Sequence, residues 1–245
     1  MIDPWIWLGV FILLAYTIEA ITGFGSIVIA LSLGALLLPI PEMLPVLVPL
    51  NIFMSGYLAW RNRQHIQWSL LLKLILPLML IGMLLGYGLR PWLDGQVLKA
   101  LFGLLVLWFA GRELLRMFRG HESGAHPGWL SRSLTLGAGV THGLFASGGP
   151  LLVYALAGTT LDKSKLRATL ISVWFGLNSS MTILFLLDGS LLPAVPHILS
   201  YLPLLVIGVL LGEFLHHRLN EQRFRQVIYS LLVVTGVLLL GKAVL

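Results

Sequence analysis

The few charged residues of this 245-residue chain separate long apolar segments, and this pattern narrows the choice of fold. Residues 43–60 and 191–212 contain no Asp, Glu, Lys or Arg, and residues 4–41 contain only Glu19. A helix needs about 20 apolar residues to cross the hydrocarbon core of a bilayer. Charged residues make up 11% of the chain, whereas soluble domains carry roughly 25%. The sequence therefore predicts an all-α polytopic membrane protein, and it excludes a soluble enzyme and a nucleic-acid-binding module.

Charge and cysteine content limit the partners. The formal net charge of +6 does not require an anionic polymer, because the cytoplasmic loops of membrane proteins carry an excess of Lys and Arg. The chain has no cysteine, which excludes a disulfide, a thiolate metal site and a cysteine nucleophile. The histidines in the polar stretches lack metal-ligand spacing. We therefore expect no metal, no cofactor and no nucleic acid, with the lipid bilayer as the main partner.

The two halves of the chain resemble each other. Residues 81–106 align without gaps on residues 207–232, and two shorter matches precede this one in the same order. The matched residues are Gly82 with Gly208, Gly86 with Gly212, Gln96 with Gln222, Asn51 with Asn178, and Gly25 with Gly149. The alignment predicts two homologous transmembrane repeats, residues 1–117 and 130–245, joined by a cytoplasmic loop at 118–129. The glycine pairs spaced four apart are typical of close helix packing.

The loop charges predict how these repeats are oriented. Four loops carry most of the Lys and Arg residues, and such loops lie in the cytoplasm. Their basic residues are Arg61 and Arg63; Arg112, Arg116, Arg119 and Arg132; Lys163, Lys165 and Arg167; and Arg218, Arg223 and Arg225. Placing all four loops inside requires residues 134–161 to enter the membrane and return as a re-entrant hairpin.

Residues 4–41 then form the matching broken hairpin of the first repeat. Three transmembrane helices follow each hairpin, at 43–60, 68–89 and 97–117 in the first repeat and at 168–187, 191–212 and 226–245 in the second. Both termini are predicted outside, and the two repeats have inverted topology, which is common among secondary transporters.

Helix-breaking residues cluster inside both predicted hairpins. The clusters are Gly23, Phe24, Gly25 and Ser26 in the first hairpin, and Ser147, Gly148, Gly149 and Pro150 in the second. Non-helical backbone at membrane depth is stable only where protein buries it or where it lines a cavity. Each break leaves a half-helix N-terminus, whose N–H groups and positive dipole end favour an anion. We expect these residues to bind a small anionic substrate near the membrane midplane; the alternative is that the glycines serve only helix packing.

The sequence resembles a known family at these breaks. GFGSIVIALSL in the first half and FASGGPLLVYAL in the second, together with the two-half layout, are similar to the TauE/SafE sulfite exporter family over essentially the whole chain. The resemblance implies a carrier of small sulfur-containing anions, such as sulfite, thiosulfate or organosulfonates, in the inner membrane. We therefore expect a secondary transporter rather than an enzyme, with no catalytic residue.

Four polar residues near the breaks are candidates for binding or coupling. Asn51 and Asn178 follow the two hairpins at matched positions, and each can bind a substrate oxygen or join two helices by a hydrogen bond. Glu19 and His142 precede the breaks, and ionisable residues inside a membrane are functional candidates. We expect these two to couple protonation to transport. The simpler alternatives are that Glu19 bonds backbone N–H groups at its break and that a neutral His142 donates to a backbone carbonyl.

Other functions remain open from the sequence. The string Ala146-Ser147-Gly148 is similar to the nucleophile motif of rhomboid intramembrane serine proteases. That chemistry requires a histidine base within hydrogen-bond reach of the serine, and the later histidines lie near segment ends. A transporter of another small organic anion and a receptor without transport activity also fit, as does assembly into a homo-oligomer.

Overall fold

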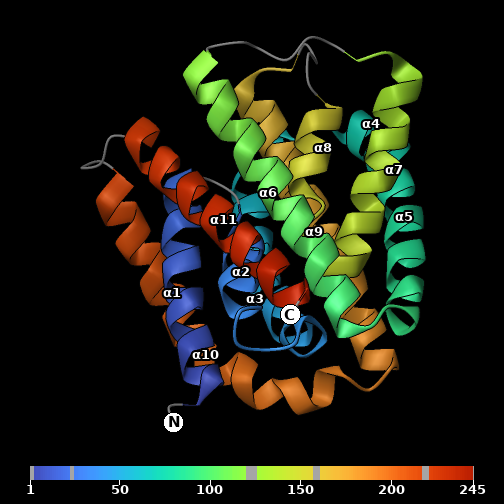
Figure 1. Ribbon diagram of the computed structural model, residues 1–245. Helices are drawn as coiled ribbons and strands as arrows, with labels where there is room; N and C mark the ends of the chain where they lie inside the picture. Colours follow the sequence, from blue (N-terminus) through green and yellow to red (C-terminus); the bar gives the residue numbers. More distant parts are fainter. Residues whose placement is uncertain (1–2, 23–24, 120–125, 157–160, 217–220, 245) are drawn as a thin grey trace. The chain divides into compact units, whose positions relative to one another are not determined.

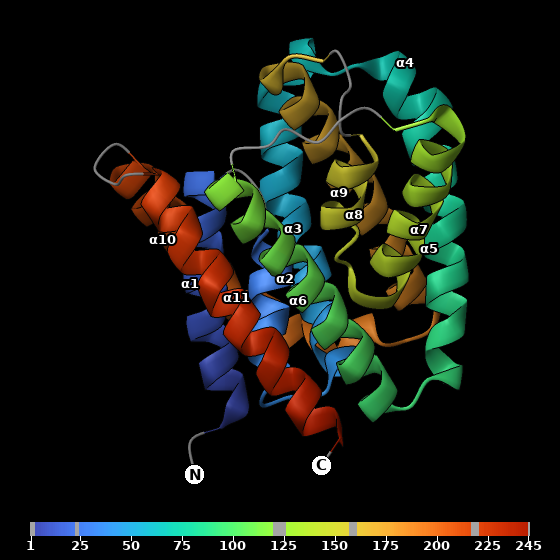
Figure 2. The ribbon, with the colours of Figure 1, turned by 45° about the horizontal axis from the view of Figure 1, so that its top comes forward.

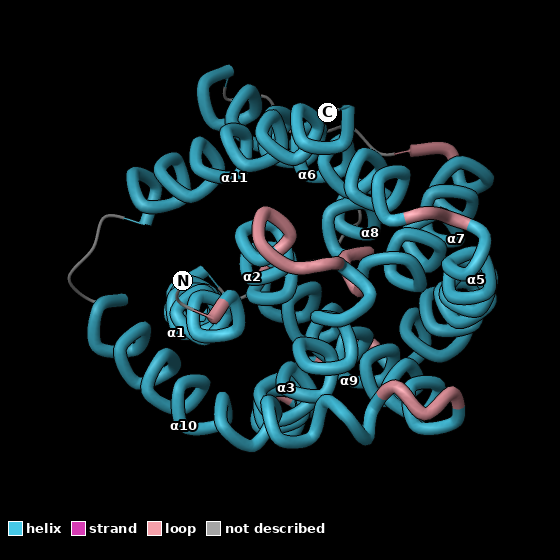
Figure 3. Tube along the Cα trace, turned by 60° about the horizontal axis from the view of Figure 1, so that its bottom comes forward, coloured by secondary structure: helices cyan, strands magenta, loops and turns pink. Residues whose placement is uncertain are grey.

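The computed structural model describes residues 3–22, 25–119, 126–156, 161–216 and 221–244. Within these ranges every regular element is a helix and none is a strand, as Figure 3 shows. The elements are α1 (Pro4–Thr22), α2 (Ser26–Gly34), α3 (Ile40–Arg61), η1 (Arg63–His65), α4 (Trp68–Leu70), η2 (Leu71–Ile75), α5 (Leu76–Leu89), η3 (Arg90–Trp92), α6 (Gly95–Arg119), α7 (Gly128–Phe145), α8 (Gly149–Ala155), α9 (Lys163–Leu187), α10 (Leu191–His216) and α11 (Glu221–Val244). The predicted all-α fold is confirmed.

Six helical segments of the described chain are long and apolar enough to cross a membrane. They are α1, α3, the continuous stretch from α4 to η3, α9, α10 and α11. The prediction of a multi-pass membrane protein is therefore confirmed. The first limb of the first hairpin is itself among the six: α1 has 19 residues, which corresponds to about 28 Å of helix, close to the thickness of the hydrocarbon core.

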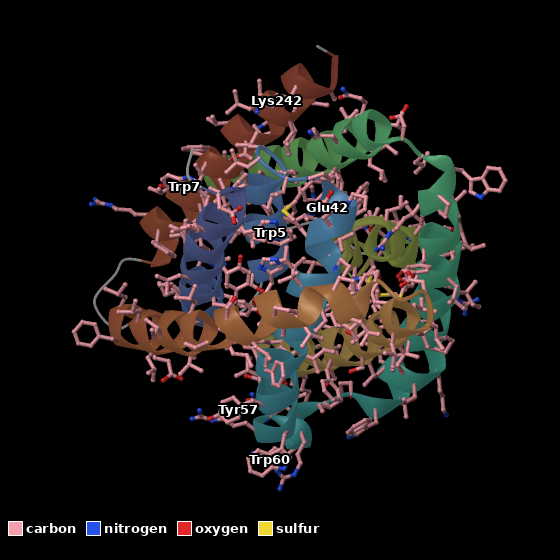
Figure 4. All side chains as sticks on the ribbon, turned by 90° about the horizontal axis from the view of Figure 1, so that it is seen from below. Trp5, Trp7, Glu42, Tyr57, Trp60 and Lys242 are labelled. Atoms are coloured by element: carbon pink, nitrogen blue, oxygen red, sulfur yellow. The ribbon has the colours of Figure 1, made fainter. Side chains whose placement is uncertain are left out.

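Large apolar side chains on the helix exteriors agree with a lipid surrounding. Leu85 on α5 is 54% exposed and Leu210 on α10 is 60% exposed. Several exposed tryptophans stand at helix ends: Trp92 follows α5, and Trp60, which is labelled in Figure 4, lies near the end of α3. Contiguous apolar surface is rare on soluble monomers, whereas tryptophan at membrane–water interfaces is common.

Both predicted hairpins are interrupted where the helix-breaking residues cluster. The first segment divides into α1 and α2, and Gly25 precedes α2 with φ of 105°. A residue with a Cβ rarely adopts this conformation, so glycine is favoured there. The second segment divides into α7 and α8, and α7 ends at Ala146 with φ of 51°. The predicted breaks are confirmed, although Gly23 and Phe24 lie outside the described residues.

The chain packs as two compact units. Unit 1 comprises Met1–Leu47, Leu93–Glu122 and Ala194–Leu245, and unit 2 comprises Val48–Trp92 and Ser123–Pro193. Unit 1 therefore holds α1, α2, α6, α11 and most of α10, whereas unit 2 holds α5, α7, α8, α9 and most of α3. Each unit draws helices from both sequence halves, so compact packing does not follow the boundaries of the predicted repeats. The two inverted repeats stay a prediction.

Matched glycines allow close helix contacts within each unit. In unit 2, α5 lies beside α7 (Figure 1), and a Cβ built on Gly86 would lie 3.1 Å from the Cα of Gly143. In unit 1, α10 packs on α1, and a Cβ built on Gly212 would lie 2.5 Å from the Cβ of Ala20. The helices α6 and α11 also run side by side in unit 1 (Figure 2). The predicted packing role of these glycine pairs is confirmed.

One transmembrane segment contains an irregular turn that the sequence pattern did not predict. Between α4 and α5, residues Leu71–Ile75 form a π-helix. Pro77 follows in the first turn of α5, where a proline needs no N–H partner. Single π-turns inside α-helices frequently stand near functional sites. This segment reaches α9, because the N–H of Gln67 donates to Oγ1 of Thr169 at 3.0 Å.

Candidate functional site

The two matched asparagines meet inside unit 2. Nδ2 of Asn178, on α9, donates to Oδ1 of Asn51, on α3, at 2.8 Å. Asn178 is 1% exposed and Asn51 is 5% exposed. Oδ1 of Asn178 is buried and has no hydrogen-bond partner among the described residues. Of the two roles expected for the asparagines, this contact is the hydrogen bond between helices. The side-chain oxygen of Asn178 takes no part in it.

His142 lies in the last turn of α7, beside the second break. It is 1% exposed, and its ring is stacked on that of Trp174, with centroids 6.1 Å apart and 13° between the planes. The imidazole interacts with the nearby Asn178 side chain, but neither ring nitrogen makes a well-formed hydrogen bond to a described residue. The expected donation to a backbone carbonyl is therefore not observed.

The second break packs tightly against its own hairpin and against α9. A Cβ built on Gly148 would lie 3.0 Å from Cβ of His142 and still closer to the carbonyl oxygen of Ala138. A Cβ built on Gly149 would lie 3.3 Å from the Trp174 ring. Pro150 occupies the first turn of α8, a position that suits proline. The glycines therefore serve close packing at this break, directly beside His142 and Trp174.

Ser147 has a local hydrogen bond instead of a histidine partner. Its Oγ donates to the carbonyl oxygen of Phe145 at 2.9 Å, and the residue is 3% exposed. The nitrogens of His142 accept nothing from it, since they have no partner in the described chain. The serine–histidine contact that protease chemistry needs is thus not formed between these two side chains.

The first break differs because an internal carboxylate caps it. Glu19, at the end of α1, is 6% exposed, and its Oε2 accepts a hydrogen bond from the N–H of Ser26 at 3.0 Å. This is the contact that the simpler interpretation of Glu19 requires. Gly25 also lines a small, mostly apolar cavity of unit 1 together with Phe109 and Tyr229. A bound anion at the N-terminus of α2 would compete with this carboxylate for backbone donors.

Comparison with known proteins identifies the family of the chain. The model of the family "Sulfite exporter TauE/SafE" matches residues 8–239. The chain belongs to the TauE/SafE family. It is also 28% identical over 193 residues to the probable inner membrane transporter protein TsaS of Comamonas testosteroni, a match that covers 77% of each chain. No solved structure matches the chain.

Membership of the TauE/SafE family confirms the resemblance seen in the sequence and identifies the chain as a membrane transporter. In this TauE/SafE chain, two residues that the sequence analysis did not identify as candidates, Trp174 and Thr182, lie near the predicted site residue Asn178. Trp174 and Thr182 stand four residues before and after Asn178, so all three share one face of α9. Oγ1 of Thr182 is buried and has no hydrogen-bond partner in the described chain. Their spacing of four residues from Asn178 along the predicted helix was the sequence signal that could have identified them.

Unit 2 of this TauE/SafE protein therefore concentrates buried, unsatisfied polar atoms between α7 and α9. They are Nδ1 and Nε2 of His142, Oδ1 of Asn178 and Oγ1 of Thr182. Native proteins leave few such atoms without a partner, so each calls for an explanation. Unit 1 brings together Glu19 and Ser26, and there the polar groups bond each other. The expectation that both helix N-termini bind one anion stays a prediction.

Proposed function

We propose that this TauE/SafE protein is a secondary transporter of a small sulfur-containing anion, namely sulfite, thiosulfate or an organosulfonate, across the inner membrane. The observation that carries the proposal is the set of unsatisfied polar atoms at His142 and Asn178, beside the break at Gly148 and Gly149. An anion oxygen there would accept a hydrogen bond from a ring N–H of His142, which has no partner among the described residues. The NH₂ group of Asn178 has two N–H donors and gives one of them to Oδ1 of Asn51, so it can donate to the same anion as well.

Helix pairing within the units supports inverted repeats. Gly82 and Gly86 of α5 pack on α7, and their matched partners Gly208 and Gly212 of α10 pack on α1. In each case the second helix after one hairpin packs on the first limb of the hairpin from the other half of the sequence. Two related repeats would make this reciprocal exchange. Secondary transporters commonly use this plan, with discontinuous helices at the binding site. Both chain termini lie outside in this proposal.

Cysteine labelling tests the orientation, because the natural chain has no cysteine. We choose three exposed positions for single cysteines. Gly128→Cys and Ser164→Cys lie on either side of the second hairpin, and Gln96→Cys lies in the first turn of α6. With a re-entrant hairpin, a membrane-impermeant maleimide should label the first two only from the cytoplasm and Gln96→Cys only from outside. Labelling of Gly128→Cys and Ser164→Cys from opposite sides would contradict the inverted topology.

Proton coupling through Glu19 or His142 belongs to the same proposal. Glu19→Gln and His142→Gln retain hydrogen-bonding groups but cannot titrate near neutral pH. At least one of these variants should transport with a flattened pH dependence, because its protonation would no longer be linked to substrate binding. The measurement is initial uptake rate into proteoliposomes between pH 5 and 9. If both variants keep the wild-type pH profile and accumulation ratio, neither residue carries the coupling proton.

A ligand panel tests the substrate class directly. The full chain, purified in detergent, is titrated calorimetrically with sulfite, thiosulfate, methanesulfonate, sulfate, acetate and chloride. We expect saturable binding of at least one of the first three, and weaker binding of acetate and chloride. Preferential binding of acetate would support the alternative of another organic anion, and absence of binding by every sulfur anion would refute the proposed function.

A further inference from the structure

Arg90 is a positively charged side chain of unit 2 whose place in the fold suggests binding. It follows α5 and begins η3. Its guanidinium carbon lies 4.8 Å from the centroid of the Tyr87 ring and 5.4 Å from that of the Phe185 ring. These cation–π contacts join the end of α5 to the end of α9 and hold the guanidinium in one position.

One edge of this guanidinium has no hydrogen-bond partner among the residues that the structure describes. Nε and Nη2 of Arg90 are both buried, and neither makes a hydrogen bond within the described chain. The ion pairs of the described residues involve Arg112 and Arg116 with Glu113, and Lys165 with Asp162, but not Arg90. Buried N–H donors of a charged group that lack a hydrogen-bond acceptor are costly. Two adjacent N–H donors on one edge match two oxygens of an oxyanion in bidentate fashion.

The neighbouring carboxylate, Asp188, has hydrogen-bond donors other than Arg90. Tyr87 donates its hydroxyl hydrogen to Oδ2 of Asp188, and Ser190 donates its backbone N–H to Oδ1 at 2.9 Å. Burial raises the pKa of the Asp188 carboxyl, but the hydrogen bonds from Ser190 and Tyr87 and the charge of Arg90 outweigh it and leave the pKa below its usual value. Asp188 is thus an ionised neighbour whose field opposes a second anion beside Arg90.

A polar face of α9 connects Arg90 with the candidate site. The Phe185 ring lies against the guanidinium. Thr182 precedes Phe185 by three residues on α9, and Asn178 precedes Thr182 by four, so these three side chains share one face of the helix. The positive charge of Arg90 also acts on His142. Thr182 therefore lies between the guanidinium edge and the unsatisfied atoms of Asn178 and His142.

We propose that the Nε–Nη2 edge of Arg90 is a second binding position for the oxyanion group of the substrate, from which the anion reaches Asn178 and His142 along the Thr182 face of α9. The inference rests on the proposed function and adds a specificity-determining residue to it. It favours substrates with at least two oxygens on one atom, such as sulfite and sulfonates, over a single-atom anion such as chloride.

Substitution of Arg90 tests the guanidinium edge. Arg90→Gln should weaken the binding of sulfite and methanesulfonate at least about tenfold, the usual size of a lost charge-assisted hydrogen bond. Arg90→Lys keeps the positive charge but not the two adjacent N–H donors of the guanidinium edge. The affinity of this variant for sulfite should therefore lie between those of Arg90→Gln and the wild type. The matched control is Arg63→Gln: Arg63 also stacks on an aromatic ring, that of Trp60 at 5.3 Å (Figure 4), but it is exposed. Its removal should leave binding unchanged.

Asp188→Asn separates anion binding from a structural role for Arg90, because only anion binding predicts that this variant binds sulfite more tightly than the wild type. If Arg90 binds the substrate, removal of the competing carboxylate should tighten sulfite binding. If Arg90 and Asp188 serve only to stabilise the helix ends, this variant should bind sulfite no better than the wild type. Should Arg90→Gln fail to fold, Arg90→Lys and Asp188→Asn decide the question.

The outcomes also distinguish this inference from the proposed function. Unchanged binding in Arg90→Gln or Arg90→Lys, or binding no tighter than that of the wild type in Asp188→Asn, would overturn the role of Arg90. Wild-type binding of sulfite would still support the transporter proposal. Absence of sulfite, thiosulfate and methanesulfonate binding by the wild type would overturn both. Calorimetric titration of the full chain in detergent provides every one of these measurements.

Discussion

Gly86→Ala should destabilise the protein strongly, whereas Gly88→Ala on the same helix should not. A Cβ on Gly86 would lie 3.0 Å from the carbonyl carbon of Val140 and 3.1 Å from Cα of Gly143, and closer still to the carbonyl oxygen of Val140. These are backbone atoms of α7, so α5 and α7 must separate. Overpacking of this kind costs about 1–3 kcal/mol or more.

Gly88 serves as the matched control. It lies two residues further along α5, it is exposed, and a Cβ there would have no neighbour within 4 Å. Alanine should even stabilise the helix at this position by up to about 1 kcal/mol. Thermal unfolding in detergent at one fixed scan rate, followed by tryptophan fluorescence, measures both variants; equal midpoints would contradict the close α5–α7 contact.

Asn178→Leu should have the largest effect on substrate binding with a modest effect on stability. The substitution removes an amide that hydrogen-bonds Asn51 and carries an unsatisfied oxygen. Hydrogen bonds between membrane helices contribute about 0.6 kcal/mol on average and up to about 1.7. A lost hydrogen bond to a charged ligand lowers affinity roughly 10- to 100-fold. Titration with sulfite and thermal unfolding of the same sample give the two effects separately.

The double variant Asn51→Leu/Asn178→Leu separates substrate binding from helix joining. Replacement of both hydrogen-bond partners by apolar side chains of similar size is nearly neutral for stability. If the amides serve only to join α3 and α9, the double variant should fold and bind sulfite like the wild type. If Asn178 binds the anion, the double variant should recover stability but not affinity. If the double variant recovers both the stability and the sulfite affinity of the wild type, Asn51 and Asn178 serve only to join the two helices.

The apolar segments and the breaks could be predicted because they depend on local chemistry. Segments of about 20 apolar residues have few alternatives to transmembrane helices, and clusters of glycine, serine and proline inside such a segment favour an interruption of the helix. The positive φ of Gly25 and the position of Pro150 in the first turn of α8 follow from the same rules. The family resemblance rested on these breaks, and the family match confirms it.

Contacts between distant segments were less accessible from the sequence. The matching of Asn51 with Asn178 indicated related positions, but not that the two side chains bond each other. Arg90 was not a candidate from the sequence, because its cation–π partners Tyr87 and Phe185 become neighbours only when α5 and α9 pack. The compact units likewise combine helices from both halves, since packing follows shape and close approach rather than sequence order.

Sulfite flux across a defined membrane tests the central claim most directly. Wild-type protein and Asn178→Leu are reconstituted at equal density into liposomes, and radiolabelled sulfite uptake is followed under an imposed pH gradient and membrane potential of either sign. The account predicts saturable wild-type flux that methanesulfonate inhibits and chloride does not, with flux in Asn178→Leu reduced to a small fraction. Wild-type flux equal to that of empty liposomes under every gradient, or equal to that of Asn178→Leu, would contradict it.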